Sequence, residues 1–177
     1  MKNITKIDEK GYRIYEKHVA FWGSILSNFG NCSFELDDRK YRWSEQAFMV
    51  EKALCFHDME AVDRIMAAEF PNQCKQYGRE VKNYDDEVWS EKRVDAMYKV
   101  VKAKFEQDEK CRKFLLQPKF AGKKFVEGSP FDKIWGVGVD YRDDRVDDES
   151  QWNGQNLLGK TLDRVRDELR SDDTKID

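Results

Sequence analysis

The chain has 177 residues, 40% hydrophobic and 38% charged, which is long enough for one domain with a hydrophobic core. Its formal net charge of −3 argues against a protein held to nucleic acid mainly through phosphates. The four cysteines form no C-x-x-C pair and there are only two histidines, which argues against structural zinc, a disulfide framework and a histidine-based triad. If the protein is an enzyme, carboxylates and lysines are the expected catalytic groups.

The ends of the chain are polar, and no signal peptide or span of about twenty apolar residues is present. We therefore expect a cytoplasmic protein without membrane contact. Residues 1–10 are expected to be a flexible N-terminus and residues 171–177 a flexible C-terminal tail, on either side of one domain at residues 11–170.

In the N-terminal part of the domain, apolar and polar residues alternate as is typical of short strands. Residues 12–22 predict a strand or a strand pair, and Ser27-Asn28-Phe29-Gly30 predicts a turn. Residues 32–36 and 40–43 alternate on either side of Asp37-Asp38-Arg39, which predicts a hairpin.

A helix with an unusually apolar surface is predicted to follow this hairpin, from Ser44 as N-cap to Phe56. Because it is apolar nearly all the way round, it belongs inside the domain. Glu45 and Lys52 are seven residues apart, so they share one stripe of this helix with Met49. Either this stripe faces solvent, or its charges are buried and therefore paired or used.

Further helical patterns occupy the middle of the chain. Asp58 is a good N-cap for a helix that stops before Pro71, and the longest helix is predicted at residues 86–107. Trp89 near its start belongs either to the core or to a pocket wall. Arg79, which follows a glycine, is either a phosphate ligand or a surface arginine.

The last third predicts a short helix at residues 110–116, a strand at 120–126 and a terminal amphipathic helix from Leu157. The glycine-rich stretch 127–138 around Asp132 is not typical of a packed element, since glycine permits backbone to approach a ligand. Its spacing matches neither a Walker nor a Rossmann fingerprint. The acidic residues 140–150 predict a solvated loop. The expected fold class is α+β, predominantly α-helical, with short β-strands and a hairpin near the N-terminus.

Nine short segments between about residues 20 and 170 follow one another in the order of a known family. They are Ser27-Asn28-Phe29, Trp43-Ser44-Glu45 with Lys52, Gly78-Arg79, Trp89, Lys104-Phe105-x-Gln107, Leu115-Leu116, Val126-Glu127, Asp132-x-x-Trp135-Gly136-x-Gly138 and Asn156-Leu157-Leu158-Gly159. No segment is specific alone, but the ordered set resembles the YbiA-like, or NADAR, family of N-glycosidases. The resemblance implies a single YbiA-like domain.

The resemblance also implies a reaction, cleavage of the N-glycosidic bond between a base-like amine and C1 of a phosphorylated ribose. Positive charge then develops on the sugar, where a carboxylate stabilises it, and an acid protonates the leaving base. The implied carboxylates are Glu45 and Asp132, with interchangeable roles. Lys52 is either an anchor for phosphate or hydroxyl groups or a nucleophile that forms a Schiff base with the opened ribose.

The other site residues implied by the resemblance bind substrate. Trp89 and Trp135 would sandwich the base on either side, and Arg79 would hold phosphate. Asn28 and Asn156 would fix the sugar hydroxyls, and Gly136 belongs to the glycine-rich loop beside the substrate. No metal or cofactor is implied.

Two departures from the family bear on the substrate. Family members often have His-Tyr-Phe where this chain has Gln46-Ala47-Phe48, and the acidic residues 140–150 interrupt the family's compact glycine-rich run. The implied partners are a small phosphorylated ribosyl molecule, such as a phosphoribosylaminopyrimidine of riboflavin synthesis, or an ADP-ribosylated guanine base. Nucleic acid is thus expected only as modified substrate. The alternative function is a non-hydrolytic module that binds NAD or ADP-ribose.

Overall fold

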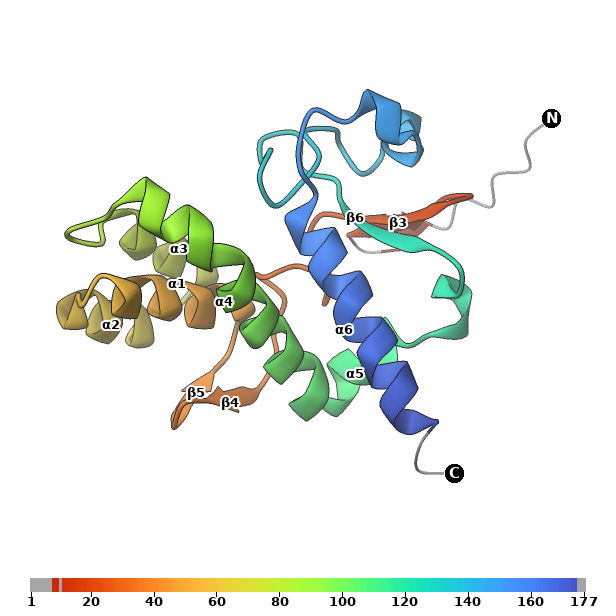
Figure 1. Cartoon of the computed structure of the whole chain (residues 1–177). Helices are drawn as coiled ribbons and strands as arrows, with labels where there is room; N and C mark the ends of the chain where they lie inside the picture. The colour runs from red at the N-terminus through yellow and green to blue at the C-terminus, as the bar shows by residue number, and fades with distance from the viewer. Residues whose placement is uncertain (1–7, 10, 175–177) are drawn as a thin grey trace. The chain divides into compact units, whose positions relative to one another are not determined.

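The computed structural model describes residues 8–9 and 11–174, and these form an α+β fold that is predominantly helical (Figure 1). The strands are β1 Asp8–Glu9, β2 Tyr12–Ile14, β3 His18–Phe21, β4 Phe34–Leu36, β5 Arg39–Tyr41 and β6 Lys124–Glu127. The α-helices are α1 Ser44–Cys55, α2 Met59–Met66, α3 Pro71–Arg79, α4 Asp86–Gln107, α5 Glu109–Leu115 and α6 Leu157–Asp173. Short 3-10 turns are η1 Pro118–Phe120, η2 Asp144–Asp147 and η3 Glu149–Gln151. The expected fold class is confirmed.

Regular structure reaches further toward both ends than the sequence predicted. Asp8–Glu9 pair with β2 as an antiparallel strand, within the segment expected to be a flexible N-terminus. Helix α6 continues to Asp173, within the expected C-terminal tail. The rest of both expected tails, residues 1–7, 10 and 175–177, lies outside the described residues.

The chain forms two compact units, one from residues 28–109 and one from the described parts of residues 1–27 and 110–177. In the second of these, the strand order is β1-β2-β3-β6, and β3 pairs in parallel with β6. Helix α6 runs along β6 (Figure 1). The Asp163 carboxylate accepts the amide hydrogen of Phe125 at 3.0 Å, which ties the helix to the strand.

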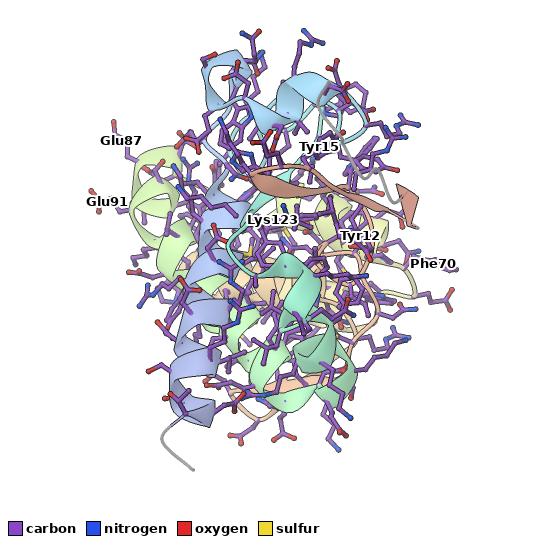
Figure 2. All side chains as sticks on the ribbon, turned by 90° about the vertical axis from the view of Figure 1, so that its right-hand side faces the viewer. Tyr12, Tyr15, Phe70, Glu87, Glu91 and Lys123 are labelled. Carbon is purple, nitrogen blue, oxygen red and sulfur yellow. The ribbon has the colours of Figure 1, made fainter. Side chains whose placement is uncertain are left out.

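The acidic residues 140–150 are largely solvated, as their composition predicted, with Arg142, Asp144, Arg145 and residues 148–150 exposed, but the chain also folds the segment onto β3. Val146 is fully buried, and the Tyr15 hydroxyl donates to the Tyr141 carbonyl at 2.7 Å. Asp147 accepts hydrogen bonds from the His18 backbone amide at 3.1 Å and contacts its ring Nδ1 at 2.9 Å. Lys123 caps the same region by donating to the Tyr15 carbonyl at 2.7 Å (Figure 2).

The unit formed by residues 28–109 is built around α1, which packs on α2, α3 and α4. Its hairpin of β4 and β5 turns at Asp37 and Asp38, whose φ angles of 48° and 60° suit the two-residue turns of twisted hairpins. Ala47, Val50 and Ala53 of α1 have no exposed surface. The all-round apolar sequence therefore does indicate a buried helix, as predicted.

Two helix starts differ from the sequence prediction. Trp43 occupies the N-cap position of α1, so the predicted cap Ser44 is wrong; it is the first helical residue and is fully buried. Helix α3 was not predicted, because Pro71 was taken only as the end of the preceding helix. Proline is equally suited to the first turn of a helix, where its missing amide hydrogen costs nothing. Asp58 caps α2 as predicted, accepting from the Ala61 amide at 3.0 Å.

Candidate functional site

Glu45 is a nearly buried carboxylate in the first turn of α1, with 7% of its surface exposed. Its backbone amide donates to the Asn28 carbonyl at 3.0 Å, so the turn before β4 is fastened to the start of the helix. The Asn28 side-chain amide points to the Met97 sulfur at 3.5 Å. The interpretation in which the charged stripe of α1 faces solvent is therefore wrong at Glu45.

Lys52 lies two turns further along α1 and is half-buried. Its Nζ donates to the Gly78 carbonyl at 2.8 Å and lies 4.2 Å from the centre of the Tyr84 ring. Burial lowers the pKa of Lys52; the carboxylates of Asp86 and Glu45 oppose that change, and the Arg79 guanidinium adds to it. Lys52 and Glu45 are thus electrostatically coupled on one helix.

The approach of α3 to α1 depends on Gly78. A Cβ at this position would lie 1.9 Å from the Met49 sulfur and 2.8 Å from its Cγ, so no other residue fits without displacing Met49. Met49 is itself buried with 8% exposed. The glycine therefore lets the α3 backbone come close enough for its carbonyl to meet Lys52.

Trp89 and Arg79 differ in how available they are to a ligand. Trp89 is buried with 6% exposed, and its ring packs on Phe48 at 5.3 Å, which favours the core interpretation over an open pocket wall. Arg79 ends α3 and is exposed, so its guanidinium is accessible to an anion.

The glycine-rich stretch in the other unit is an ordered turn. The Oδ1 atom of Asp132 accepts the amide hydrogens of Ile134 at 2.9 Å and Trp135 at 2.8 Å. Its own amide donates to the Ser129 hydroxyl at 3.1 Å. As predicted, residues 128–138, all within the described chain, form no helix or strand, and the hydrogen bonds of Asp132 close the turn from within.

Gly136 and Asn156 join this turn to the sheet. A Cβ on Gly136 would lie 2.8 Å from the Glu127 carbonyl oxygen, so glycine is required for the close approach. The Asn156 side chain accepts from the Glu127 amide at 3.0 Å and donates to the Phe125 carbonyl at 3.0 Å. These bonds commit the amide of Asn156 to the backbone of β6. Trp135 is half-buried in the same turn.

The structure thus gathers the predicted residues into two groups. Asn28, Glu45, Lys52, Arg79 and Trp89 belong to residues 28–109, whereas Asp132, Trp135, Gly136 and Asn156 belong to the other unit.

The sequence interpretation missed three partners of Lys52, namely the Gly78 carbonyl, the Tyr84 ring and the Asp86 carboxylate. Only the Tyr84 ring could have been noticed in the sequence, as an aromatic residue followed by two acidic residues at the start of a predicted helix. Within residues 8–9 and 11–174, no cluster of three histidine, cysteine or acidic side chains is placed to hold a metal ion. Nor is any helix in the described chain long and apolar enough to cross a membrane.

Comparison with known proteins gives a family and a fold. The NADAR domain model matches residues 16–170. Protein irg-1 of Caenorhabditis elegans is 43% identical over 132 residues, which are 73% of this chain and 61% of that protein. N-glycosidase R617 of Acanthamoeba polyphaga mimivirus is 36% identical over 129 residues, 73% of this chain and 75% of that protein. The NMR structure of the Escherichia coli protein YbiA has the same fold, with a TM-score of 0.73 at 24% identity over 96% of this chain and 94% of that one.

Proposed function

This chain belongs to the NADAR domain family, and we propose that it is an N-glycosidase that cleaves the bond between a base-like amine and C1 of a phosphorylated ribose. The observation that carries the proposal is Glu45, a carboxylate with 7% exposure on the same helix as a half-buried lysine. A buried carboxylate beside a half-buried ammonium on one helix is costly for stability, and such an arrangement is typical of a catalytic site.

Glu45 supplies the group that this reaction needs most. As the bond to the base breaks, positive charge develops at C1 of the sugar, and a carboxylate in a site of low dielectric stabilises that charge. The same carboxylate can direct a water molecule to C1. The leaving base departs after it receives a proton, and the products are a free sugar phosphate and the base.

Lys52 has two roles that one experiment separates. As an ammonium it would hold a phosphate or hydroxyl oxygen of the substrate, with the exposed Arg79 as a second anchor for phosphate. As a neutral amine it would attack C1 of the ribose and expel the base, which leaves with a proton; the ring of the adduct would then open to a Schiff base, which water later hydrolyses to free sugar phosphate and the amine. Borohydride reduction during turnover traps only the second route, as a covalent sugar adduct on Lys52.

Asp132 stays a prediction from the family resemblance. Its Oδ1 already accepts two amide hydrogens of its own turn, and an asparagine at this position would keep that acceptor while removing the charge. If Asp132→Asn retains both fold and turnover, Asp132 shapes the turn. If the fold is kept and turnover is lost, its charge takes part in the reaction.

The proposed substrate is a small phosphorylated ribosyl molecule in preference to an ADP-ribosylated base within nucleic acid. The net charge of −3 supports this choice, because a polyanionic strand would be repelled by the chain as a whole. The test is incubation of the purified chain with a phosphoribosylaminopyrimidine and, separately, with ADP-ribosylated guanine in DNA, followed by mass spectrometry of the released sugar. Release from neither substrate would contradict the proposal.

The alternative function is a module that binds NAD or ADP-ribose without cleaving it. The reason to consider it is that Gln46 and Ala47 differ from the residues common in the family. In the structure Gln46 donates to the Ile65 carbonyl at 3.1 Å and accepts from the Arg42 amide at 3.2 Å, and Ala47 has no exposed surface. Both residues serve packing, so their difference from the family is no argument for a binding module. Calorimetric binding of ADP-ribose without any sugar release would favour the module instead.

A further inference from the structure

The amine of Lys52 contacts a backbone carbonyl, that of Gly78, and an aromatic ring, that of Tyr84. An ammonium carries three N–H donors. One of them is directed to the Gly78 carbonyl at 2.8 Å, and the amine also lies over the face of Tyr84 at 4.2 Å. Among the residues that the structure describes, Gly78 is the one hydrogen-bond acceptor for this amine. A donor therefore remains for a substrate.

The Tyr84 ring is in turn held in place by Asp86. The Tyr84 hydroxyl donates to the Asp86 Oδ1 at 2.7 Å, and the ring meets Phe56 edge-on at 5.4 Å. The hydrogen bond to this carboxylate, followed by burial, raises the pKa of Tyr84 to about 12. The phenol therefore stays protonated at neutral pH and keeps donating to Asp86, which lies in the first turn of α4, where the helix dipole stabilises an acid.

Charged groups from three helices act on Lys52. Asp86 of α4 and Glu45 of α1 favour the ammonium, whereas Arg79 of α3 and burial favour the neutral amine. The Tyr84 ring favours the ammonium as well, because its π-face attracts a cation. Asp86 thus acts twice, through its own charge and through the ring that its hydrogen bond fixes.

We propose that Tyr84 and Asp86 are positioning residues, which fix the place of the Lys52 amine and set the pH at which it loses its proton. The use of Lys52 in glycoside cleavage rests on the proposed function, but the arrangement of the three residues does not. Neither Tyr84 nor Asp86 needs to touch the substrate. Their effect on the reaction passes through Lys52.

Three variants separate the contributions. Asp86→Asn keeps an oxygen that can accept from Tyr84 and removes the charge. Tyr84→Leu keeps an apolar cover and removes the ring, whereas Tyr84→Phe keeps the ring and removes only its hydrogen bond. Glu87→Gln is the matched control, because Glu87 is exposed on the same turn of α4 and points away into solvent (Figure 2).

The direct measurement is the pKa of Lys52 in the full chain, from the pH dependence of its acetylation by trace acetic anhydride, read by mass spectrometry of the peptide. We expect Asp86→Asn to lower this pKa by about half a unit to one unit, and Tyr84→Leu by about half a unit. Tyr84→Phe frees the ring from Asp86 but leaves both the ring and the Asp86 charge in place, so it should lower the pKa by less than Tyr84→Leu, whereas Glu87→Gln should stay close to the wild type. Circular dichroism verifies that each variant is folded.

The same variants are then assayed for sugar release across pH. The limb of the pH profile that reports Lys52 should move with the labelling pKa in Asp86→Asn and stay in place in Glu87→Gln. An unchanged labelling pKa in folded Asp86→Asn and Tyr84→Leu would overturn the inference. A shifted labelling pKa in a chain that releases no sugar would support the inference and count against the proposed function.

Discussion

The glycine that admits Lys52 to its acceptor can be tested by adding one methyl group. Gly78→Ala places a Cβ 1.9 Å from the Met49 sulfur and 2.8 Å from its Cγ, well inside contact distance. Helix propensity alone predicts the opposite sign, since alanine within a helix is about 1 kcal/mol more favourable than glycine. The sign of the measured change therefore decides between local propensity and the packing of α3 on α1.

The expected magnitude follows from overpacking. Inserting a methyl group into a filled contact costs about 1–3 kcal/mol, and two atoms of a buried side chain in the way favour the upper end. Subtracting the gain in propensity leaves a net loss of about 2 kcal/mol. For a chain of 177 residues this lowers the melting temperature by about 4–8 °C.

The assay is urea and thermal unfolding followed by circular dichroism, for Gly78→Ala, Met49→Ala and the double variant. Truncating Met49 makes room for the new methyl group, so we expect Gly78→Ala to be less costly in that background, with a coupling of at least about 1 kcal/mol. A Gly78→Ala variant that is more stable than the wild type, with no coupling to Met49, would refute the packing described here.

Two further predictions concern the unit that contains α6. Asn156→Ala should cost about 2–4 kcal/mol of stability in urea unfolding, because it leaves the part-buried Glu127 amide and the buried Phe125 carbonyl without side-chain partners. Unchanged stability with a raised KM would instead mark Asn156 as a sugar ligand. Burial raises the pKa of Asp163 to about 6 from 3.8, so the folded chain binds this proton more tightly than the unfolded chain. Ionisation of the Asp163 carboxylate therefore lowers the free energy of unfolding. This loss is absent below about pH 4 and complete above about pH 6, and it amounts to at most about 3 kcal/mol before solvent screening reduces it. Asp163→Asn should remove this fall in stability between pH 4 and 6, and a retained fall would contradict the assignment.

Hydrophobic periodicity and turn residues predicted the secondary structure correctly where tertiary packing did not favour a different arrangement. The apolar stripe of residues 86–107 gave the bounds of α4, and the Asp37-Asp38 pair gave the hairpin turn. Local signals failed where burial decided instead. Ser44 has the chemistry of an N-cap, yet packing draws it into the first turn, and Pro71 can end one helix or begin the next.

The candidate site was only partly predictable for a similar reason. Periodicity placed Glu45 and Lys52 on one stripe of α1, because both belong to a single helix. The partners of Lys52 come from other elements, and a backbone carbonyl such as that of Gly78 has no signature in the sequence. Asp132 was implied as a site residue by the family resemblance, whereas its hydrogen bonds to its own turn became visible only in the structure.

The central claim is that the buried carboxylate of Glu45 carries the cleavage of an N-glycosidic bond. The most direct test compares sugar release by Glu45→Gln with release by Glu51→Gln, a half-buried glutamate on the same helix that pairs with Lys99 at 3.2 Å. The account predicts a loss of at least about 100-fold in Glu45→Gln and near wild-type release in Glu51→Gln. Full turnover in a folded Glu45→Gln variant would contradict it.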